Sequence, residues 1–450
     1  MLRQQPYNNI IMKNLILILF FIPTLLFSQG WERTYGGEKP DAGYSVQQTT
    51  DGGYIVAGSS YQFGDHSDVY LLKTDNNGDT LWTKTYWDWS TNHDWGYSVQ
   101  QTTDGGYIIT GENSSFAGTG QRYTYLIKTD NNGDTSWTKM YGGLGKDVVG
   151  YSLQQTTDGG YVITGSIWTI GNGKDVHLIK TDNFGDTLWT KSYGRCDNEI
   201  GYSVQQTTDS GFIITGVTNS CESDTTRSHV YLIKTDSNGD TLWTKIYREN
   251  DYDVGHSVRQ TTDGGYIIAG ETSSWWGEDI HDVYLIKTDH NGDTLWTRTL
   301  GGESSDEGHS VQQTTDGGYI ITGSTDLIGS GYSTYDVFLL KTDLNGDTLW
   351  SKTFGGEDTD IGRSVKQTTD GGYIITGWTF PNTNYADLYL IKTDENGIIT
   401  FTSNIPVSNP NRKLVKTVDF SGKEITDPKT SQPYIEIYND GSTKKKMKLK

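Results

Sequence analysis

The sequence predicts an all-β protein built from one four-stranded unit that occurs seven times, and three observations lead to this prediction. A phrase close to G-Y-S-V-Q-Q-T-T-D-G-G-Y-I-I-T-G begins at Gly43, Gly96, Gly150, Gly201, Gly255, Gly308 and Gly362. A second phrase, V-Y-L-I-K-T-D-x-N-G-D-T-L-W-T-K, follows each copy in full or in part. Glycine (55 residues) is frequent and proline (8) is scarce, which is typical of short strands joined by tight turns.

Each unit divides into four strands. We expect Y-S-V-Q-Q to form the first strand, Y-I-I-T-G the second, V-Y-L-I-K the third and L-W-T-K-T-Y the fourth. The Asp-Gly and Asn-Gly pairs between them supply the positive φ angles of tight hairpins. Four antiparallel strands in a repeat of about 50 residues are the unit of a β-propeller. The sequence therefore predicts a seven-bladed β-propeller over residues 30–403, with an open β-solenoid as the alternative fold.

The two ends of the repeat region predict how the ring closes. The segment Trp31–Gly37 has the pattern of a fourth strand, but no first three strands precede it. The last unit has three strands and then Asp394–Gly397, after which the repeated tryptophan is missing. We therefore expect the N-terminal strand to complete the seventh blade, which removes the exposed edges of an open sheet.

The hairpin between the third and fourth strands carries a further pattern, seen in Asp75, Gly78 and Trp82 and repeated in the next five units. It resembles the tryptophan-docking motif of quinoprotein propellers. The resemblance implies that the repeated tryptophans are structural and lie buried between blades. It carries over no quinone ligand, and we expect no cofactor. The structural tryptophans are Trp31, Trp82, Trp137, Trp189, Trp243, Trp296 and Trp350.

Residues 1–29 have the layout of a secretory signal peptide. A lysine, Lys13, precedes an apolar run from Leu15 to Phe27, and Ser28 and a polar chain follow. Met12 is an alternative start of translation. After removal of this segment, no other stretch is apolar enough to span a membrane.

The glycine-rich repeats stop before Asn404, and residues 404–450 read as a small β-domain. Pro410-Asn411, Val418-Asp419 with Gly422-Lys423, Tyr438–Gly441 and the lysine-rich end resemble the C-terminal sorting domain of type IX secretion substrates. The resemblance implies the type IX secretion machinery as a partner. It also implies a place outside a Gram-negative bacterium, in the medium or on the outer cell surface. A generic β-hairpin is the alternative.

The net charge argues against several classes of binding partner, and the cysteine content limits the possible disulfides. The net charge of −20 argues against a partner of nucleic acid or an anionic membrane surface, since both need a basic footprint. The two cysteines, Cys196 and Cys221, fall in two connections of the same unit, so they form either a disulfide or two free thiols.

Residues able to carry chemistry occur mostly once in every unit. D-x-N-G-D has glycine in the wrong position for a calcium loop of the EF-hand type, so we interpret it as a hairpin turn. An acidic residue precedes every first strand, and we expect it to cap backbone amides; a metal ring and catalysis are the alternatives. His256 and His309 stand where most units have tyrosine, which favours a packing role. The acidic residues are Asp41, Asp94, Asp147, Glu199, Asp253, Asp306 and Asp360.

The units differ in two connections, between the second and third strands and between one unit and the next. Both should lie on the same face of the disc, which we call the variable face. The other turns keep a constant length and form the constant face. Seven non-repeat tryptophans fall in or beside the variable connections: Trp87, Trp89, Trp95, Trp168, Trp275, Trp276 and Trp378.

Exposed tryptophans among polar loop residues are typical of binding surfaces, although loop packing is an alternative role for them. We expect a non-enzymatic protein that binds a glycan or a protein partner, with Trp275 and Trp276 as the best anchors. A secreted polysaccharide hydrolase or lyase and a purely structural surface protein are the alternatives.

Overall fold

A computed structural model gives the fold of the chain. The residues that it describes are 30–61, 66–86, 93–114, 121–143, 145–169, 173–194, 198–219, 227–273, 280–302, 304–326, 334–380, 385–399, 414–418, 423, 425, 433–438 and 443–447.

The described strands group into seven blades and one small terminal sheet. Blade 1 contains β2 (Asp41–Gln48), β3 (Tyr54–Ser60), β4 (Asp68–Thr74) and β5 (Thr80–Tyr86). Blade 2 contains β6 (Asp94–Gln101), β7 (Tyr107–Ser114), β8 (Arg122–Thr129) and β9 (Thr135–Tyr141). Blade 3 contains β10 (Lys146–Gln155), β11 (Tyr161–Thr169), β12 (Gly173–Thr181) and β13 (Thr187–Tyr193). Blade 4 contains β14 (Glu199–Gln206), β15 (Phe212–Asn219), β16 (Ser228–Thr235) and β17 (Thr241–Tyr247).

Blade 5 contains β18 (Tyr252–Gln260), β19 (Tyr266–Ser273), β20 (Asp282–Thr288) and β21 (Thr294–Leu300). Blade 6 contains β22 (Asp306–Gln313), β23 (Tyr319–Asp326), β24 (Tyr335–Thr342) and β25 (Thr348–Phe354). Blade 7 contains β26 (Asp360–Gln367), β27 (Tyr373–Thr379), β28 (Asp387–Thr393) and the N-terminal strand β1 (Trp31–Tyr35). The terminal sheet contains β29 (Leu414–Val418), β30 (Pro433–Tyr438) and β31 (Thr443–Met447), in antiparallel order.

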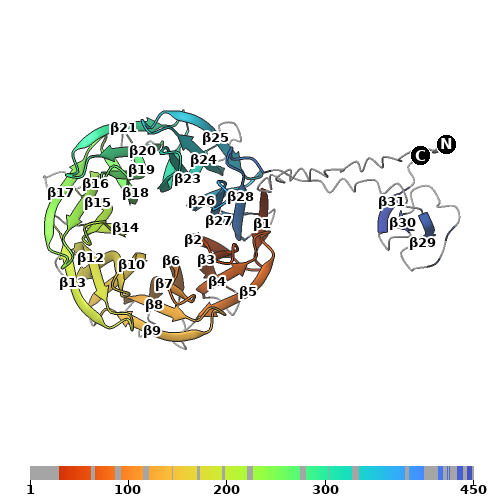
Figure 1. Ribbon diagram of the computed structural model, residues 1–450, viewed down its shortest axis with the longest axis horizontal. Helices are drawn as coiled ribbons and strands as arrows, with labels where there is room; N and C mark the ends of the chain where they lie inside the picture. Colours follow the sequence, from red (N-terminus) through yellow and green to blue (C-terminus); the bar gives the residue numbers. More distant parts are fainter. Residues whose placement is uncertain are drawn as a thin grey trace, which may run out of the picture.

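The seven blades form a closed ring, in which the first strand of each blade lies innermost and the fourth lies outermost (Figure 1). Strand β1 pairs antiparallel with β28, and Thr34 lies opposite Tyr389. Strand β28 follows β26 and β27 in the same sheet. The predicted seven-bladed propeller closed by its N-terminal strand is therefore confirmed, and the solenoid alternative is wrong.

The fourth strand of each blade docks on the hairpin of the next blade. In blade 4, Trp243, Lys245 and Tyr247 share one face of β17, because alternate residues of a strand point the same way. The Lys245 ammonium lies 2.7 Å from the Asp293 carboxylate, and the Tyr247 hydroxyl donates to the Gly292 carbonyl at 2.7 Å. The indole of Trp243 lies against Gly292 and meets the ring of Tyr266 edge-on at 6.0 Å.

Strand β1 repeats this arrangement across the closure of the ring. Trp31 lies against Gly78 of blade 1, and the Tyr35 hydroxyl donates to the Gly78 carbonyl at 2.5 Å. Arg33 takes the place of the lysine and pairs with Asp79 at 3.0 Å. The contacts that join neighbouring blades thus continue around the whole ring.

The repeated tryptophans pack against the next blade, but they are half-buried, whereas burial between blades was predicted. Their burial is incomplete because the tryptophan stands on the outermost strand. The neighbouring blade therefore covers one side of the indole and leaves its outer edge at the rim.

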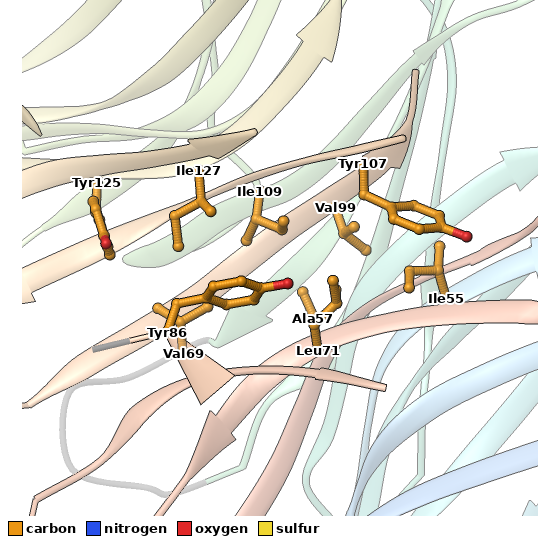
Figure 2. Close-up of a cluster of buried hydrophobic side chains, with 10 residues drawn as sticks. All are labelled: Ile55, Ala57, Val69, Leu71, Tyr86, Val99, Tyr107, Ile109, Tyr125 and Ile127. Carbon is orange, nitrogen blue, oxygen red and sulfur yellow. The ribbon is translucent and has the colours of Figure 1, made fainter. Parts of the chain in front are cut away.

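Apolar residues of adjacent blades fill the space between them. Figure 2 shows Ile55, Val69 and Leu71 of blade 1 facing Ile109 and Ile127 of blade 2. Each of these side chains is at most 1% exposed. Equivalent clusters occur at the other blade interfaces, so the core is a set of layers between blades and not one central mass.

The constant turns are held by a repeated polar contact. In blade 1 the Asp51 carboxylate accepts from the Thr49 hydroxyl at 2.5 Å, the Gly53 amide at 3.0 Å and the Lys73 ammonium at 3.1 Å. Lys73 is only 3% exposed, so this ion pair satisfies a cation that the blade encloses. The same Asp–Lys pair occurs in every blade: Asp51–Lys73, Asp104–Lys128, Asp158–Lys180, Asp209–Lys234, Asp263–Lys287, Asp316–Lys341 and Asp370–Lys392.

Candidate functional site: the axial aromatic belt on the variable face

A β-bulge singles out one residue in the first strand of each blade. In blade 1 the pairing register shifts between Gly43 and Ser45, so Tyr44 has no partner on β3. The bulge lies in the half of β2 that follows the variable connection. The equivalent residues are Tyr44, Tyr97, Tyr151, Tyr202, His256, His309 and Arg363.

The six aromatic bulge residues contact one another in succession around the axis. From Tyr44 to His309, the ring centroids of neighbours lie 5.4–5.5 Å apart. The four tyrosines and His256 are half-buried, so part of each ring remains accessible. We call these six residues together with Arg363 the aromatic belt. It forms an aromatic and polar lining on the variable side of the axis.

Blades 5 and 6 break the symmetry of the belt with histidine. Nε2 of His256 lies 3.4 Å from Oε1 of Glu271, and Nδ1 of His281 lies 3.7 Å from the other oxygen of that carboxylate. Nε2 of His309 lies 3.2 Å from Oε2 of Glu307. We call these five residues the His–Glu cluster. The interpretation of His256 and His309 as packing variants is therefore incomplete, since both also make polar contacts with carboxylates.

The His309–Glu307 contact shifts the ionisation of both groups. The hydrogen bond from His309 is the main cause that lowers the pKa of Glu307 to about 2, against the opposing effect of burial. Burial lowers the pKa of His309. However, Nδ1 of His309 also lies 2.8 Å from the Gly362 carbonyl, so both ring nitrogens face acceptors. Only the protonated imidazole donates from both nitrogens, and these two acceptors therefore oppose the effect of burial.

Arg363 occupies the bulge position of blade 7 and lies against an aromatic side chain. Its guanidinium carbon is 4.6 Å from the ring centroid of Trp378, within the range of a cation–π contact. Trp378 in turn meets Tyr44 edge-on at 5.9 Å, which closes the belt between blades 7 and 1, so Trp378 is counted as a further member of the belt. Nε of Arg363 is buried and has no hydrogen-bond partner among the described residues.

The structure describes three of the seven tryptophans that were expected to group on the variable face. Trp378 belongs to the belt, and Trp95 of blade 2 is half-buried and stacks on His93 at 5.5 Å. Trp168 of blade 3 is 36% exposed. Within the described ranges, no two of these three indoles make a ring contact. Four further candidates and both cysteines lie outside the described residues: Trp87, Trp89, Trp275, Trp276, Cys196 and Cys221.

The acidic residues at the start of the first strands serve as caps. The Asp41 carboxylate accepts from the Gly37 amide at 3.2 Å, and Asp360 accepts from the Gly356 amide at 2.7 Å. Glu199 accepts from the Thr218 hydroxyl at 2.8 Å. Burial raises the pKa of Asp41 and of Asp360. The contacts of Asp41 and Asp360 agree with the expected capping of backbone amides, whereas Glu199 holds a side-chain hydroxyl.

Neither a metal centre nor a membrane-spanning helix is found among the residues that the structure describes. Over that part of the chain, no group of three or more histidine, cysteine, aspartate or glutamate side chains is arranged to hold a metal ion. The same ranges contain no helix of the length and apolarity that a bilayer crossing requires.

Comparisons with known proteins agree on the fold. No model of a known protein family matches the chain, and no curated protein matches it. Among solved structures, an ulvan lyase bound to its saccharide has a TM-score of 0.52 at 11% identity, over 82% of this chain and 97% of that chain. A puromycin hydrolase has a TM-score of 0.51 at 12% identity, over 90% of this chain and 59% of that chain. An α-L-arabinanase of Penicillium chrysogenum has a TM-score of 0.44 at 12% identity, over 67% and 93%.

The likeness is one of fold. At such identities it assigns no activity to this chain.

One signal in the sequence could have identified the belt. The residue after the first glycine of the repeat is tyrosine in four units but His256, His309 and Arg363 in three consecutive units. The position after the last glycine of the first phrase also varies, and it holds Glu112 in the second unit, Glu271 in the fifth and Trp378 in the seventh. Departures from the repeat at two positions that the bulge brings together mark the part of the molecule with its own chemistry.

Proposed function

We propose that this protein is a non-enzymatic binding protein that recognises a glycan through the aromatic belt on its variable face. The observation that carries the proposal is the succession of partly accessible aromatic rings around the axis. Aromatic faces combined with a few polar groups are typical of sites for small polar ligands with apolar faces, such as sugars.

Three residues at the closure of the belt support this proposal. Trp378 and Tyr44 present aromatic surface, and the half-buried Arg363 contributes a guanidinium group. A sugar ring offers C–H groups to the aromatic rings and hydroxyl oxygens to the guanidinium group. A protein partner is the other ligand that such a surface could take, and it remains an outcome of the test.

A glycan array followed by calorimetric titration with the best oligosaccharide tests the proposal. We expect Trp378→Ala to weaken binding by about 10-fold, which corresponds to about 1.4 kcal/mol. Phe184→Ala is the matched control, because this aromatic side chain is 63% exposed on a constant turn. Its affinity should equal that of the wild type. Equal losses in both variants, or a wild type that retains no glycan, would contradict the proposal. Binding to a protein but to no glycan would replace the glycan with a protein partner.

A polysaccharide-active enzyme is the second candidate function, and the His–Glu cluster is the observation that favours it. Catalysis by acids and bases requires groups tuned differently from one another, and a cluster confined to two blades meets this requirement. The oligosaccharides that bind should therefore also be incubated with the protein and analysed by mass spectrometry. Cleavage that Glu307→Gln abolishes would favour the enzyme, whereas intact oligosaccharide favours the binding protein.

We also propose that the protein acts outside the cell, exported by its N-terminal segment and by the type IX machinery. The sorting-domain resemblance of residues 404–450 supports this proposal, and these residues include a separate three-stranded sheet. We expect the protein recovered from culture medium to begin near residues 28–30 and to lack its tail. Peptide mapping of both ends measures this. A cell-associated protein with an intact Lys450 would contradict a sorting role of the tail.

A further inference from the structure

The central channel carries two cations at positions where the other blades carry glutamine. The residue three positions after the bulge is Gln47, Gln100, Gln154, Gln205 and Gln312 in five blades. In blade 5 it is Arg259, and in blade 7 it is Lys366. The first strands of all seven blades surround a cavity of about 260 Å³, and both cations belong to its lining. This cavity lies nearer the constant face than the aromatic belt does, because these positions come later in the first strands.

Neither cation has a carboxylate partner within the described residues. Nη1 of Arg259 donates to the Val258 carbonyl at 3.0 Å, and the residue belongs to the cavity lining. The cavity lining includes serine, valine, leucine and glutamine but no aspartate or glutamate. Burial lowers the pKa of Lys366, and the positive charge of Arg259 lowers it further. Both side chains are half-buried, and their charges repel each other across the cavity that they share.

The contrast with the other enclosed cations is sharp. Each blade has a buried lysine on its third strand, and each of these lysines pairs with an aspartate at 2.8–3.0 Å. Enclosed cations are normally paired in this way, since an uncompensated charge is costly. In a chain of net charge −20, Arg259 and Lys366 are thus an exception that requires a counter-charge.

The presence of arginine and lysine in place of glutamine also removes the side-chain acceptors of two backbone amides. In the other blades the glutamine carbonyl accepts from an amide of the next blade, as in Gln101 N to Gln47 Oε1 at 2.7 Å. In this arrangement, the Gln313 amide is the one that would donate to residue 259, and the Gln48 amide is the one that would donate to residue 366. Arginine and lysine side chains have no acceptor, so these two amides lack the side-chain partner that their five counterparts have.

Serine hydroxyls add further donors to the same cavity. Ser310 Oγ accepts from the Val365 amide at 3.3 Å, and Ser364 Oγ accepts from the Val46 amide at 3.4 Å. Because each oxygen accepts from a backbone amide, each hydroxyl hydrogen remains able to donate. The cavity therefore combines two cations with several neutral donors.

We propose that the central channel binds one small oxyanion, of the size of phosphate or sulfate, between Arg259 and Lys366. The guanidinium group matches two oxygens of such an anion, and the ammonium group supplies the second charge. The bound anion neutralises the two cations. It also accepts hydrogen bonds from the amides of Gln313 and Gln48, whose counterparts in the other blades donate to a glutamine side chain. This site is separate from the glycan site proposed for the aromatic belt.

The test is calorimetric titration of the full chain with inorganic phosphate, sulfate and chloride, together with thermal unfolding in each salt. We expect one phosphate or sulfate per chain with a Kd below about 1 mM, weaker binding of chloride, and a rise of the unfolding midpoint. The double variant Arg259→Gln/Lys366→Gln should lose this binding by at least about 50-fold. It should also unfold without added salt at the wild-type temperature or above, because it restores the glutamines of the other blades.

Lys84→Gln is the matched control. It removes a cation that pairs with Asp134 on the rim at 2.7 Å, and its phosphate affinity should equal that of the wild type. A monosaccharide sulfate ester, titrated in parallel, distinguishes a free oxyanion from a sulfate group carried by a glycan. If the ester binds more tightly than sulfate and the double variant loses this preference, the anion belongs to a glycan. The proposal is overturned if the wild type binds no oxyanion. It is also overturned if the double variant binds as well as the wild type or is less stable without anion.

Discussion

Gly377→Ala is expected to destabilise the protein by about 4 kcal/mol or more, or to prevent recovery of folded protein. Gly377 lies on β27 opposite Gly362, next to the bulge of blade 7. A Cβ atom at this position would collide with the carbonyl oxygen of Ile361, which is backbone and cannot turn aside. Extra atoms in packed cores commonly cost 1–3 kcal/mol, and a collision with backbone is expected to cost about 4 kcal/mol or more.

Gly356→Ala is the control for this prediction. A Cβ atom at Gly356 would meet no atom within 4 Å. The substitution should be neutral or stabilise by up to about 1 kcal/mol, because alanine has fewer unfolded conformations than glycine. Urea unfolding followed by tryptophan fluorescence measures both variants. Similar midpoints for the two would show that the second strand can move away from the bulge, contrary to the prediction.

Trp243→Ala is expected to lower the free energy of unfolding by about 3 kcal/mol. The indole joins blade 4 to blade 5 through its contacts with Gly292 and Tyr266, and it packs against the apolar cluster between these blades. Truncation to alanine would leave a cavity that the two sheets could close only by changing their angle. Half-burial of the indole places the expected loss at the lower end of the range for core tryptophans.

The neighbouring residue provides the control. Leu242 belongs to the same strand, but its side chain points away from blade 5 and is 58% exposed. Leu242→Ala should change the unfolding free energy by less than about 0.5 kcal/mol. Calorimetric unfolding of both variants decides the matter. Equal losses would mean that the cost arises from the strand itself and not from docking between blades.

The repeats made most of the fold predictable. Strand identity, hairpin positions and closure by Trp31–Tyr35 followed from alternation, from Asn-Gly and Asp-Gly pairs, and from the missing strand of the last unit. Burial of the repeated tryptophans was overestimated. A sequence pattern indicates which strand carries an indole, but it does not indicate how much of the indole the next blade covers.

The candidate site was less predictable because it depends on the bulges. A bulge adds one residue without a partner and changes the direction of the side chains around it. Simple alternation therefore gives no reason to place Tyr44 beside Tyr97, or Arg363 beside Trp378. The prediction instead emphasised the tryptophans of the variable connections. Of these, the structure describes three, and only Trp378 joins the belt.

Closure by β1 has a consequence for the order in which the chain folds. Glu32 and its partner Tyr389 are 357 residues apart, so a chain made at about 5–20 residues per second emits β1 tens of seconds before its partner strand. Strands β4, β8 and the other third strands each receive their own fourth strand through a short hairpin, within about 10 µs. Among the described third strands, β28 alone has no fourth strand of its own from the same hairpin. Because the hairpins form first, we expect them to keep the similar strand β1 from inserting into the wrong blade, so that β1 pairs with the last blade to be synthesised.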